Sequence, residues 1–332
     1  MRIFSGIQPT GAKHFGNYSG GFRQYVATQE TAASSGGEAF FCIVDLHSIT
    51  VDYDPADLRD RTLDLAALLF AVGLDPDRST VFAQSHVTAH AEAAWLLSAS
   101  TSYGQLGRMT QFKEKADRQD VVTAGLFTYP ILMAGDILLY QADVVPIGDD
   151  QRQHLELSRD VAERFNSRFG HTFKVPAGAY PEIGARIMDL QDPARKMSTT
   201  GGTPQGTILM LDPPAAIRKK VRSAMTDSGS EVRRGPDKQG VTNLIDIMTV
   251  ATGETAEAIE ARYAGGGYGP FKGDVAEALV ALLEPIQQRY AELREDPAEL
   301  SRLLAAGAEK ARSTAAPTLR SMYERMGFAL LE

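Results

Sequence analysis

Residues 1–200 alternate short apolar runs with segments of helical periodicity, and this alternation constrains the fold more than any other feature of the sequence. The apolar runs that predict strands are residues 2–7, 39–44, 80–84 and 144–147. Strands that alternate with helices are typical of a parallel α/β sheet, in which helices connect one strand to the next. Ligands bind such sheets beyond the carboxyl ends of the strands, so the residues after each run are the first candidates for a functional site.

The second part of the chain is predicted to be helical. Beyond Asp212 the strand patterns give way to amphipathic periodicity, with a long helical stretch at residues 275–293. A last helical segment is predicted at residues 298–331, and we expect Pro317 to interrupt it.

The overall charge argues against an extended nucleic-acid-binding surface. Lys and Arg number 34 against 42 Asp and Glu, giving a net charge of −8, whereas nucleic-acid binding needs clustered cations. A local cluster of cations does occur between Asp212 and Arg234. Its members are Arg218, Lys219, Lys220, Arg222, Arg233 and Arg234. On charge alone, a solvated helix face explains this cluster equally well.

Other bulk features favour a cytoplasmic protein. The N-terminal sequence lacks the charged region, apolar core and cleavage site of a secretion signal. No apolar run is long enough to predict a membrane span. The single cysteine, Cys42, excludes an intramolecular disulfide and a cysteine-cluster zinc site, and its apolar neighbours predict a position in the core.

The first candidate site follows the first predicted strand. Residues 5–11 form a Gly-containing turn, and a helical pattern opens at residues 14–17, His-Phe-Gly-Asn. A helix N-terminus after such a turn binds anions through its free backbone N–H groups, and His14 and Asn17 are placed to donate to phosphate oxygens. The segment matches neither GxGxxG nor a P-loop, and a plain turn capped by Asn17 explains it equally well.

Two further candidates are the end of the last predicted strand and a Gly-rich loop. Gly148 lets a ligand approach the backbone closely, and Asp149 and Asp150 are suited either to binding ribose hydroxyls or to capping the next helix. Lys196 lies in a loop at residues 196–204, whose residues are too small and Gly-rich to pack a core, and we expect this loop to be mobile. Without further context, a lone lysine in a loop is a solvated charge.

Together these segments resemble the class I aminoacyl-tRNA synthetases. Residues 14–17 resemble the HIGH-type motif of that class, and residues 196–200, Lys-Met-Ser-Thr-Thr, resemble its KMSKS-type loop. More narrowly, the chain resembles the bacterial tryptophanyl-tRNA synthetases in residues 4–11, 109–115, 132–140, 148–154 and 266–272. The resemblance covers essentially the whole chain. It implies activation of tryptophan with ATP, followed by transfer of tryptophan to tRNA(Trp).

The resemblance also implies which residues bind ATP, the substrate that supplies the adenylate. They are Gln8, Pro9, Thr10, Gly16, Asn17, Gly148, Asp149, Asp150, Ile187, Lys196, Met197, Ser198, Thr199 and Thr200. Lys196, Asn17 and Gln8 among them, together with His14, are expected to be catalytic. The attacking carboxylate is already ionised, so catalysis needs positioning and stabilisation of phosphate charge but no general base. Mg²⁺ is expected to bind through the ATP phosphates, with no dedicated protein ligand.

The tryptophan-binding residues implied by the resemblance centre on one acidic side chain. They are Asp136, Gln151, Tyr129, Phe4, His47, Met133, Val145 and Ile147. Asp136 is expected to accept from the indole N–H, Gln151 and Tyr129 to contact the amino group, and the others to form the pocket wall. Burying an unpaired carboxylate in an apolar stretch costs roughly several kcal/mol of folding free energy. A ligand N–H removes that cost and rejects phenylalanine; a local cation as the partner of Asp136 is the alternative.

One position departs from the pattern of the family. Many members carry a second lysine in the loop where this chain has Thr199, and Lys113, Lys115 and Arg195 are candidates to replace that charge. Thr199 keeps open a paralogue that binds tryptophan or ATP without aminoacylation. A tyrosyl-tRNA synthetase, which shares both motifs, is the other alternative, but the surroundings of Asp136 favour tryptophan. A nucleotidyltransferase for small substrates would have less use for the helical region.

The expected fold class is therefore α/β, a Rossmann-like parallel-sheet catalytic domain with an all-helical second domain. Residues 1–200 are expected to form the domain that binds ATP and tryptophan, and residues 201–296 the helical domain that binds the tRNA anticodon. Residues 297–332 are expected to be helical and to pack back on the catalytic domain. The resemblance also implies a homodimer, with residues 109–115 near the active site and the dimer interface.

Overall fold

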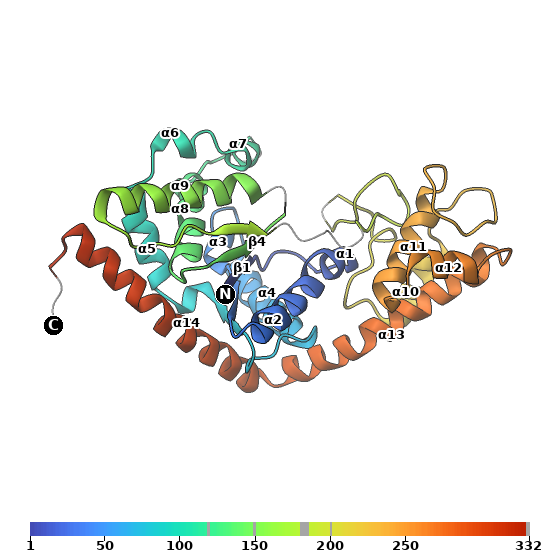
Figure 1. Ribbon diagram of the computed structural model, residues 1–332. Helices are drawn as coiled ribbons and strands as arrows, with labels where there is room; N and C mark the ends of the chain where they lie inside the picture. The colour runs from blue at the N-terminus through green and yellow to red at the C-terminus, as the bar shows by residue number, and fades with distance from the viewer. Residues whose placement is uncertain (118–119, 149–150, 180–185, 200, 330–332) are drawn as a thin grey trace. The chain divides into compact units, whose positions relative to one another are not determined.

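The computed structural model describes residues 1–117, 120–148, 151–179, 186–199 and 201–329 (Figure 1). The chain divides into two compact units. Unit 1 consists of Met1–Thr10, Ala27–Pro181 and Asp296–Glu332, and unit 2 of Gly11–Val26 and Glu182–Glu295.

Unit 1 is built on a parallel sheet. Its strands are β1 (Arg2–Ile7), β2 (Glu38–Ile43), β3 (Thr80–Ala83), β4 (Val144–Pro146) and β5 (Ala177–Ala179), in the order β3-β2-β1-β4-β5. Every neighbouring pair is parallel, so the predicted α/β class is confirmed. The sequence did not predict β5, because this strand is short, contains a glycine and lies partly exposed.

Helices surround this sheet and connect its strands (Figure 1). They are α2 (Arg23–Ser34), α3 (Asp45–Ser48), α4 (Pro55–Ala71), α5 (Ala89–Ser98), α6 (Tyr103–Leu106), α7 (Thr110–Ala116), α8 (Ala124–Leu138), α9 (Arg152–Phe169) and α14 (Pro297–Met326), with a 3₁₀ turn η2 (Gln84–His86). Helix α8 packs against both α5 and α9. The apolar surface of α8 is therefore buried on two sides.

The core of unit 1 contains a group of aromatic rings around Tyr140. The ring centroid of Tyr140 lies 5.3 Å from that of Phe4, 4.9 Å from that of Phe40 and 5.7 Å from that of Phe82. These three phenylalanines come from β1, β2 and β3. The rings thus join the sheet to the chain segment that follows α8.

Helix α14 packs against β3 and α5. A Cβ at Gly307 would lie 1.9 Å from the carbonyl oxygen of Val81, so the glycine allows this close approach. The predicted interruption at Pro317 is wrong, because α14 continues to Met326. Proline removes one backbone hydrogen bond, but burial of Ala311, Ala315, Met322 and other residues of α14 holds the helix together.

Unit 2 is helical, as the periodicity beyond Asp212 predicts. Its elements are α1 (Phe15–Asn17), a π-helical turn η1 (Tyr18–Phe22), α10 (Pro214–Arg222), α11 (Gln239–Thr252), α12 (Ala256–Arg262) and α13 (Tyr268–Glu295). Helices α10 and α11 both pack against α13. None of the helices in the described ranges is long and apolar enough to span a membrane.

The division into units differs from the expected boundary at residue 200. The segment Gly11–Val26 and the loop that holds Lys196 both belong to unit 2. Backbone hydrogen bonds explain this: Phe15 N donates to Ile208 O, and Met210 N donates to Lys13 O, each at 2.9 Å. Such pairing between distant segments leaves no signal in local periodicity.

Candidate active site

Asp136 lies on α8 in unit 1, and its side chain is 2% exposed. Gln84 Nε2 donates to its Oδ1 at 2.6 Å, and His90 Nδ1 lies 2.6 Å from the same oxygen. His47 Nε2 lies 2.9 Å from Oδ2. The carboxylate is therefore paired on both oxygens by donors of the protein itself.

These hydrogen bonds decide the charge of Asp136. Burial raises the pKa of the carboxyl, but the hydrogen bonds from His47 and His90 more than offset this effect, and the pKa is lowered to about 2. The sequence left the partner of this carboxylate open between a ligand N–H and a local cation, and the structure pairs it with the side chains of Gln84, His47 and His90. The cost of its burial is already offset by protein donors, which leaves a ligand N–H as an additional partner.

Sequence reasoning missed Gln84 and His90. Gln84 follows β3 directly, so the rule that sites lie at strand ends could have found it. His90 is fully buried in the first turn of α5, and no motif or spacing distinguishes it from a histidine of the core.

Several of the other expected tryptophan-binding residues lie in the core of unit 1. Phe4, Val145 and Ile147 belong to one buried cluster, and Met133 packs against it. Phe4, Val145, Ile147 and Met133 thus belong to the same core, on β1, after or in β4, and on α8.

Tyr129 lies in the same region, 6.1 Å from His47 between ring centroids. Its hydroxyl lies 2.8 Å from Nε2 of His154, a residue that sequence reasoning missed. Burial raises the pKa of Tyr129 to about 12, so the phenol stays protonated. Gln151, the remaining residue expected to contact the amino group, directly precedes α9 and is partly buried.

In unit 2, the segment 14–17 forms the first turn of a helix, as the sequence predicts. His14 is the N-cap of α1, and its backbone N–H donates to Asn17 Oδ1 at 2.9 Å. A Cβ at Gly16 would lie 3.0 Å from the imidazole of His14 and 3.9 Å from Cβ of Ile187. Gly16 therefore leaves room for the imidazole of His14, and Ile187 lies at ordinary contact distance from the same position.

Two lysines act on His14 electrostatically. Burial, followed by the charges of Lys196 and Lys13, lowers the pKa of His14 to about 4. Burial also lowers the pKa of Lys13 to about 8. The imidazole is thus neutral near pH 7, and this part of unit 2 carries concentrated positive charge.

The loop that carries Lys196 is attached at both sides. Met188 and Lys196 form an antiparallel bridge, and Met197 N donates to Ile187 O at 3.1 Å. The side chains of Met197 and Ile187 are each 1% exposed. Ser198 O accepts from Thr207 Oγ1 at 3.0 Å. The loop thus does contribute to a core, through Met197, although its composition argued against this.

The other expected ATP-binding residues have the following positions. Gln8, Pro9 and Thr10 follow β1 in unit 1, where Thr10 N donates to Gln8 O at 2.9 Å, and Gly148 follows β4. Thr199 is exposed in unit 2, with its Oγ1 3.6 Å from the position of a Cβ at Gly11. Asp149, Asp150 and Thr200 lie outside the described residues. Within the described ranges, no group of three His, Cys, Asp or Glu side chains is arranged to hold a metal ion.

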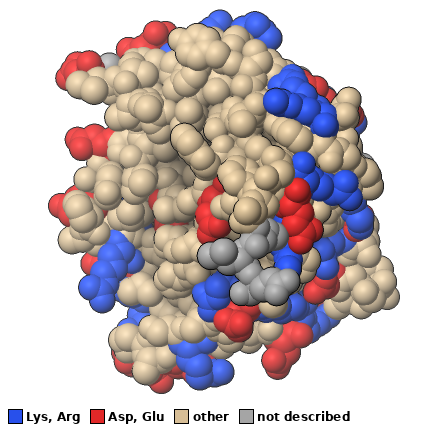
Figure 2. Space-filling view, turned by 90° about the vertical axis from the view of Figure 1, so that its left-hand side faces the viewer, with Lys and Arg blue, Asp and Glu red and all other residues tan. Residues whose placement is uncertain are grey.

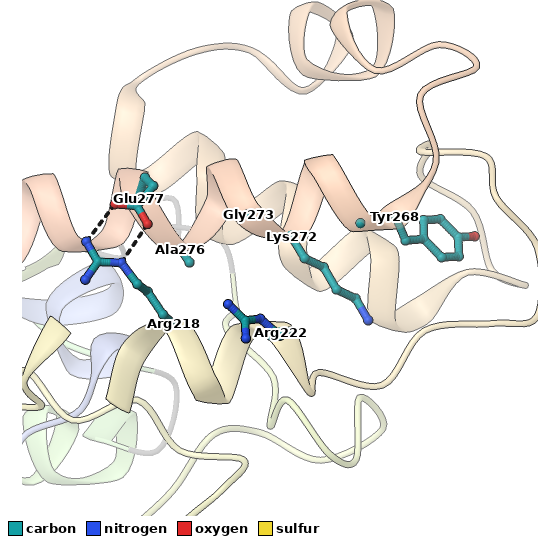
Figure 3. Close-up of a pocket in the computed structure, with 8 residues that line it drawn as sticks. Arg218, Arg222, Tyr268, Lys272, Gly273, Ala276 and Glu277 are labelled. Carbon is teal, nitrogen blue, oxygen red and sulfur yellow. Dashed lines mark hydrogen bonds and ion pairs between the residues drawn. The ribbon is translucent and has the colours of Figure 1, made fainter. Parts of the chain in front are cut away.

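A second candidate site is a basic pocket of about 380 Å³ between α10 and α13 of unit 2 (Figure 3). Arg218 pairs with Glu277 through two hydrogen bonds of 2.7 and 2.8 Å. Lys272 Nζ donates to Ala224 O at 2.8 Å, and burial lowers its pKa. Among the residues that the structure describes, neither Arg222 nor Lys272 pairs with a carboxylate. The pocket therefore has uncompensated positive charge.

The chain belongs to the class I tRNA synthetases: the model of the family described as tRNA synthetases class I (W and Y) matches residues 1–284. Among curated relatives, tryptophan–tRNA ligase 2 of Streptomyces avermitilis is 51% identical over 331 residues, covering 98% of this chain and 97% of the relative. Tryptophan–tRNA ligase of Listeria monocytogenes is 52% identical over 327 residues, with 98% and 97% covered. The resemblance inferred from the sequence motifs is confirmed.

Solved structures give the same result. Tryptophanyl-tRNA synthetase from Mycoplasma pneumoniae has a TM-score of 0.85 at 38% identity, covering 99% of this chain and 98% of the other. The enzyme from Campylobacter jejuni, complexed with ADP and tryptophan, has a TM-score of 0.86 at 33% identity, with 99% and 100% covered. A tyrosyl-tRNA synthetase from Aeropyrum pernix, at 21% identity and a TM-score of 0.66, shares the fold.

Proposed function

We propose that this chain activates L-tryptophan with ATP and transfers it to tRNA(Trp), in the cytoplasm, where protein synthesis consumes the product. The observation that carries the choice of amino acid is Asp136, an ionised carboxylate that is buried on α8, a helix whose apolar residues belong to the core of unit 1. The names of the bacterial relatives, at about half identity over nearly the whole chain, support the same choice.

In the first step, a carboxylate oxygen of tryptophan attacks the α-phosphorus of ATP. A bond forms between that oxygen and phosphorus, the bond to the bridging oxygen of the β-phosphate breaks, and pyrophosphate leaves. Lys196 and the neighbouring residues of its loop stabilise charge on the pyrophosphate, and His14 and Asn17 hold the phosphates. Mg²⁺, when bound, would be held by the phosphate oxygens of ATP and would supply further positive charge there.

Residues around the nucleoside hold the rest of ATP. Gln8, Pro9 and Thr10 after β1, Gly16 after His14, and Ile187 contact the nucleotide, and Gly148 to Asp150 bind its ribose. In the second step, a hydroxyl of the terminal ribose of the tRNA attacks the activated carbonyl carbon, and AMP leaves with the electrons of the broken C–O bond.

Selection of tryptophan follows from the pairing of Asp136. Its Oδ2 accepts from the indole N–H, whereas phenylalanine would leave that acceptor position without a partner in an apolar site. Tyr129 and Gln151 contact the amino group, and Phe4, His47, Met133, Val145 and Ile147 enclose the ring.

The test is ATP–pyrophosphate exchange with tryptophan, tyrosine and phenylalanine, run on the wild type and on Asp136→Ala. Exchange with tryptophan alone, lost in the variant, is the expected result. Exchange with tyrosine would instead identify the tyrosyl enzyme. If the folded protein binds tryptophan but catalyses exchange with no amino acid, it is a paralogue that does not activate amino acids. Thr199 would then be the residue that distinguishes it from the active enzymes.

The basic pocket of unit 2 supports tRNA binding by the helical domain at residues 201–296. Arg222 and Lys272 supply positive charge without a carboxylate partner, and such charge is suited to phosphates of an RNA backbone. Gly269 and Gly273 line the pocket, and a Cβ at either would meet open space. The α13 side of the pocket therefore has room for a bulky ligand.

Arg222→Glu and Lys272→Glu test this role. Each is expected to raise the KM for tRNA at least about tenfold in aminoacylation, with ATP–pyrophosphate exchange unchanged. The dependence of tRNA affinity on salt should become less steep by about one unit for each phosphate that the variant no longer neutralises. Arg289→Glu is the matched control, since Arg289 lies on the same helix and pairs with Glu292. Equal effects of all three variants would refute a role for the pocket.

A homodimer is part of the proposed function, and the exposed aromatic residues of unit 1 support it. Trp95 on α5 is 78% exposed, and Tyr103 on α6 is 79% exposed. Figure 2 shows the side that lies at the left of Figure 1, and over its upper part uncharged side chains form a broad area with charged ones mostly along the margin. Tryptophan and tyrosine are enriched at protein interfaces.

A further inference from the structure

The buried polar cluster behind Asp136 contains residues to which the proposed reaction assigns no role. Gln84 and His90 are each 0% exposed, and Tyr140, which contacts His90, is equally buried. Burying so many polar groups costs free energy unless each is paired. Gln84 and His90 both hydrogen-bond to one carboxylate oxygen, Oδ1 of Asp136, and Tyr140 hydrogen-bonds to His90.

The orientation of the Gln84 amide is fixed from its other side. Leu46 N donates to Gln84 Oε1 at 3.1 Å, and a backbone N–H can only donate. The oxygen of the amide therefore faces Leu46, and its NH₂ group faces Asp136 Oδ1 at 2.6 Å.

The proton of His90 is fixed in the same way. Tyr140 OH lies 2.8 Å from His90 Nε2. Burial raises the pKa of Tyr140 far above its usual range, so the phenol keeps its proton and shares a hydrogen bond with Nε2. Because the ionised Asp136 carboxylate can only accept, Nδ1 of His90 carries a proton and donates to Oδ1 at 2.6 Å. The Tyr140 ring is itself held by stacking on Phe4.

The pairing leaves one position on the carboxylate for a ligand. A carboxylate has about four acceptor positions. Gln84 and His90 use both positions on Oδ1, and His47 uses one on Oδ2. The remaining position is on Oδ2, the oxygen that faces His47.

We propose that Gln84, His90 and Tyr140 are positioning residues that hold Asp136 in one orientation and present Oδ2 to the indole N–H of tryptophan. This inference rests on the proposed function, because it presupposes that Asp136 accepts from the indole. Specificity for tryptophan then depends on three residues that do not touch the amino acid.

The experiment compares tryptophan with 3-benzothienyl-L-alanine, in which sulfur replaces the indole N–H. The quantity measured is the ratio of kcat/KM for the two amino acids in ATP–pyrophosphate exchange. Gln84→Met and His90→Leu are expected to lower this ratio about tenfold each, because each removes a hydrogen bond to a charged group. A variant that was merely less stable would lower kcat/KM for both amino acids alike and leave the ratio unchanged.

Two milder variants test the hydrogen bonds that connect Tyr140 through His90 to Asp136. Tyr140→Phe keeps the aromatic packing and removes only the hydroxyl, and it should lower the ratio less than His90→Leu. His90→Asn places an amide N–H near the position of Nδ1 and should retain more of the ratio than His90→Leu. Thr80→Val is the matched control, since Thr80 Oγ1 is buried and has no hydrogen-bond partner among the described residues.

A wild-type ratio retained in Gln84→Met, His90→Leu and Tyr140→Phe would overturn the inference and leave the proposed function intact. A wild type that does not prefer tryptophan to the sulfur analogue would remove Asp136 as the indole acceptor, and the inference with it. A wild type that exchanges with neither would refute the proposed function itself.

Discussion

The carboxylate of Asp189 occupies the space in which a side chain at Gly206 would lie, since a Cβ there would be 1.8 Å from Oδ1. The same oxygen accepts from the backbone N–H of Gln191 at 2.8 Å and of Asp192 at 3.2 Å. Asp189 N donates to Arg195 O at 2.8 Å, next to Lys196. The glycine and the carboxylate together therefore fix the turn from which the Lys196 loop starts.

Gly206→Ala should displace Asp189 and disturb this loop. The added methyl group cannot be accommodated at 1.8 Å, so overpacking is expected to lower the free energy of unfolding by about 1–3 kcal/mol. Because Lys196 moves with the turn, the KM for ATP in pyrophosphate exchange should rise while the KM for tryptophan changes little. Urea unfolding and exchange kinetics measure the two effects. Gly20→Ala, where a Cβ meets nothing within 4 Å, is the control, and an equal KM for ATP in both variants would contradict the prediction.

The low pKa of Asp136 predicts a dependence of stability on pH. The folded pKa of about 2 lies below the unfolded value of about 3.9. Ionised Asp136 therefore contributes stability above about pH 4, on the order of 2 kcal/mol, which is lost as the pH falls through the folded pKa. Asp136→Asn lacks this contribution at every pH. The free energies of unfolding of the wild type and the variant, measured by urea titration, should converge as the pH falls from about 5 to 2; a constant difference would show that the carboxylate is not ionised in the fold.

The sequence was sufficient to predict the strands that face the candidate site, because each is a short, mostly apolar segment next to a segment of helical periodicity. The segments 2–7 and 80–84 predicted β1 and β3 to within one residue. The motif at His14 also predicted the helix start that the structure has. These features depend on local sequence, which propensity and spacing describe well.

The partners of Asp136 could not be predicted in this way. His47, Gln84 and His90 are separated from it by 89, 52 and 46 residues, and parallel crossovers bring them together. The same limitation explains the assignment of Gly11–Val26 to unit 2, which depends on backbone pairing with residues near Ile208. Contacts across such distances are set by topology, which a single sequence does not encode in any local pattern.

The pKa of His14 predicts the consequence of removing Lys196. Burial and the charges of Lys196 and Lys13 lower this pKa to about 4, against an unfolded value of about 6.5. As the pH falls below that value the unfolded chain takes up a proton first, so His14 lowers stability progressively until the folded imidazole also titrates. In Lys196→Met, the pKa of His14 followed by NMR should rise, because one like charge is gone. An unchanged titration would show that Lys196 lies farther from His14 than the structure has it.

Thr199→Lys should strengthen the interaction with ATP. Thr199 is exposed in the Lys196 loop, at the position where many members of the family have a second lysine. An added cation near the phosphates is expected to lower the KM for ATP in pyrophosphate exchange several-fold, by about 1 kcal/mol of additional binding. Thr199→Gln lengthens the side chain without charge and should leave the KM unchanged. Equal KM values for ATP in the two variants would show that position 199 lies away from the phosphates. Lys196 would then be the cation through which the loop acts on ATP.

Trp95→Asp should separate the proposed dimer. The indole is 78% exposed on α5, and a buried aromatic residue at the centre of an interface typically contributes about 2 kcal/mol or more. A charge there would have to be desolvated on association, so the variant is expected to be monomeric in light scattering after size exclusion, with unit 1 still folded by circular dichroism. Leu211→Asp is the control, because Leu211 is 44% exposed on unit 2 and should leave the mass unchanged. A dimeric Trp95→Asp protein would show that the exposed aromatic residues of α5 do not form the interface.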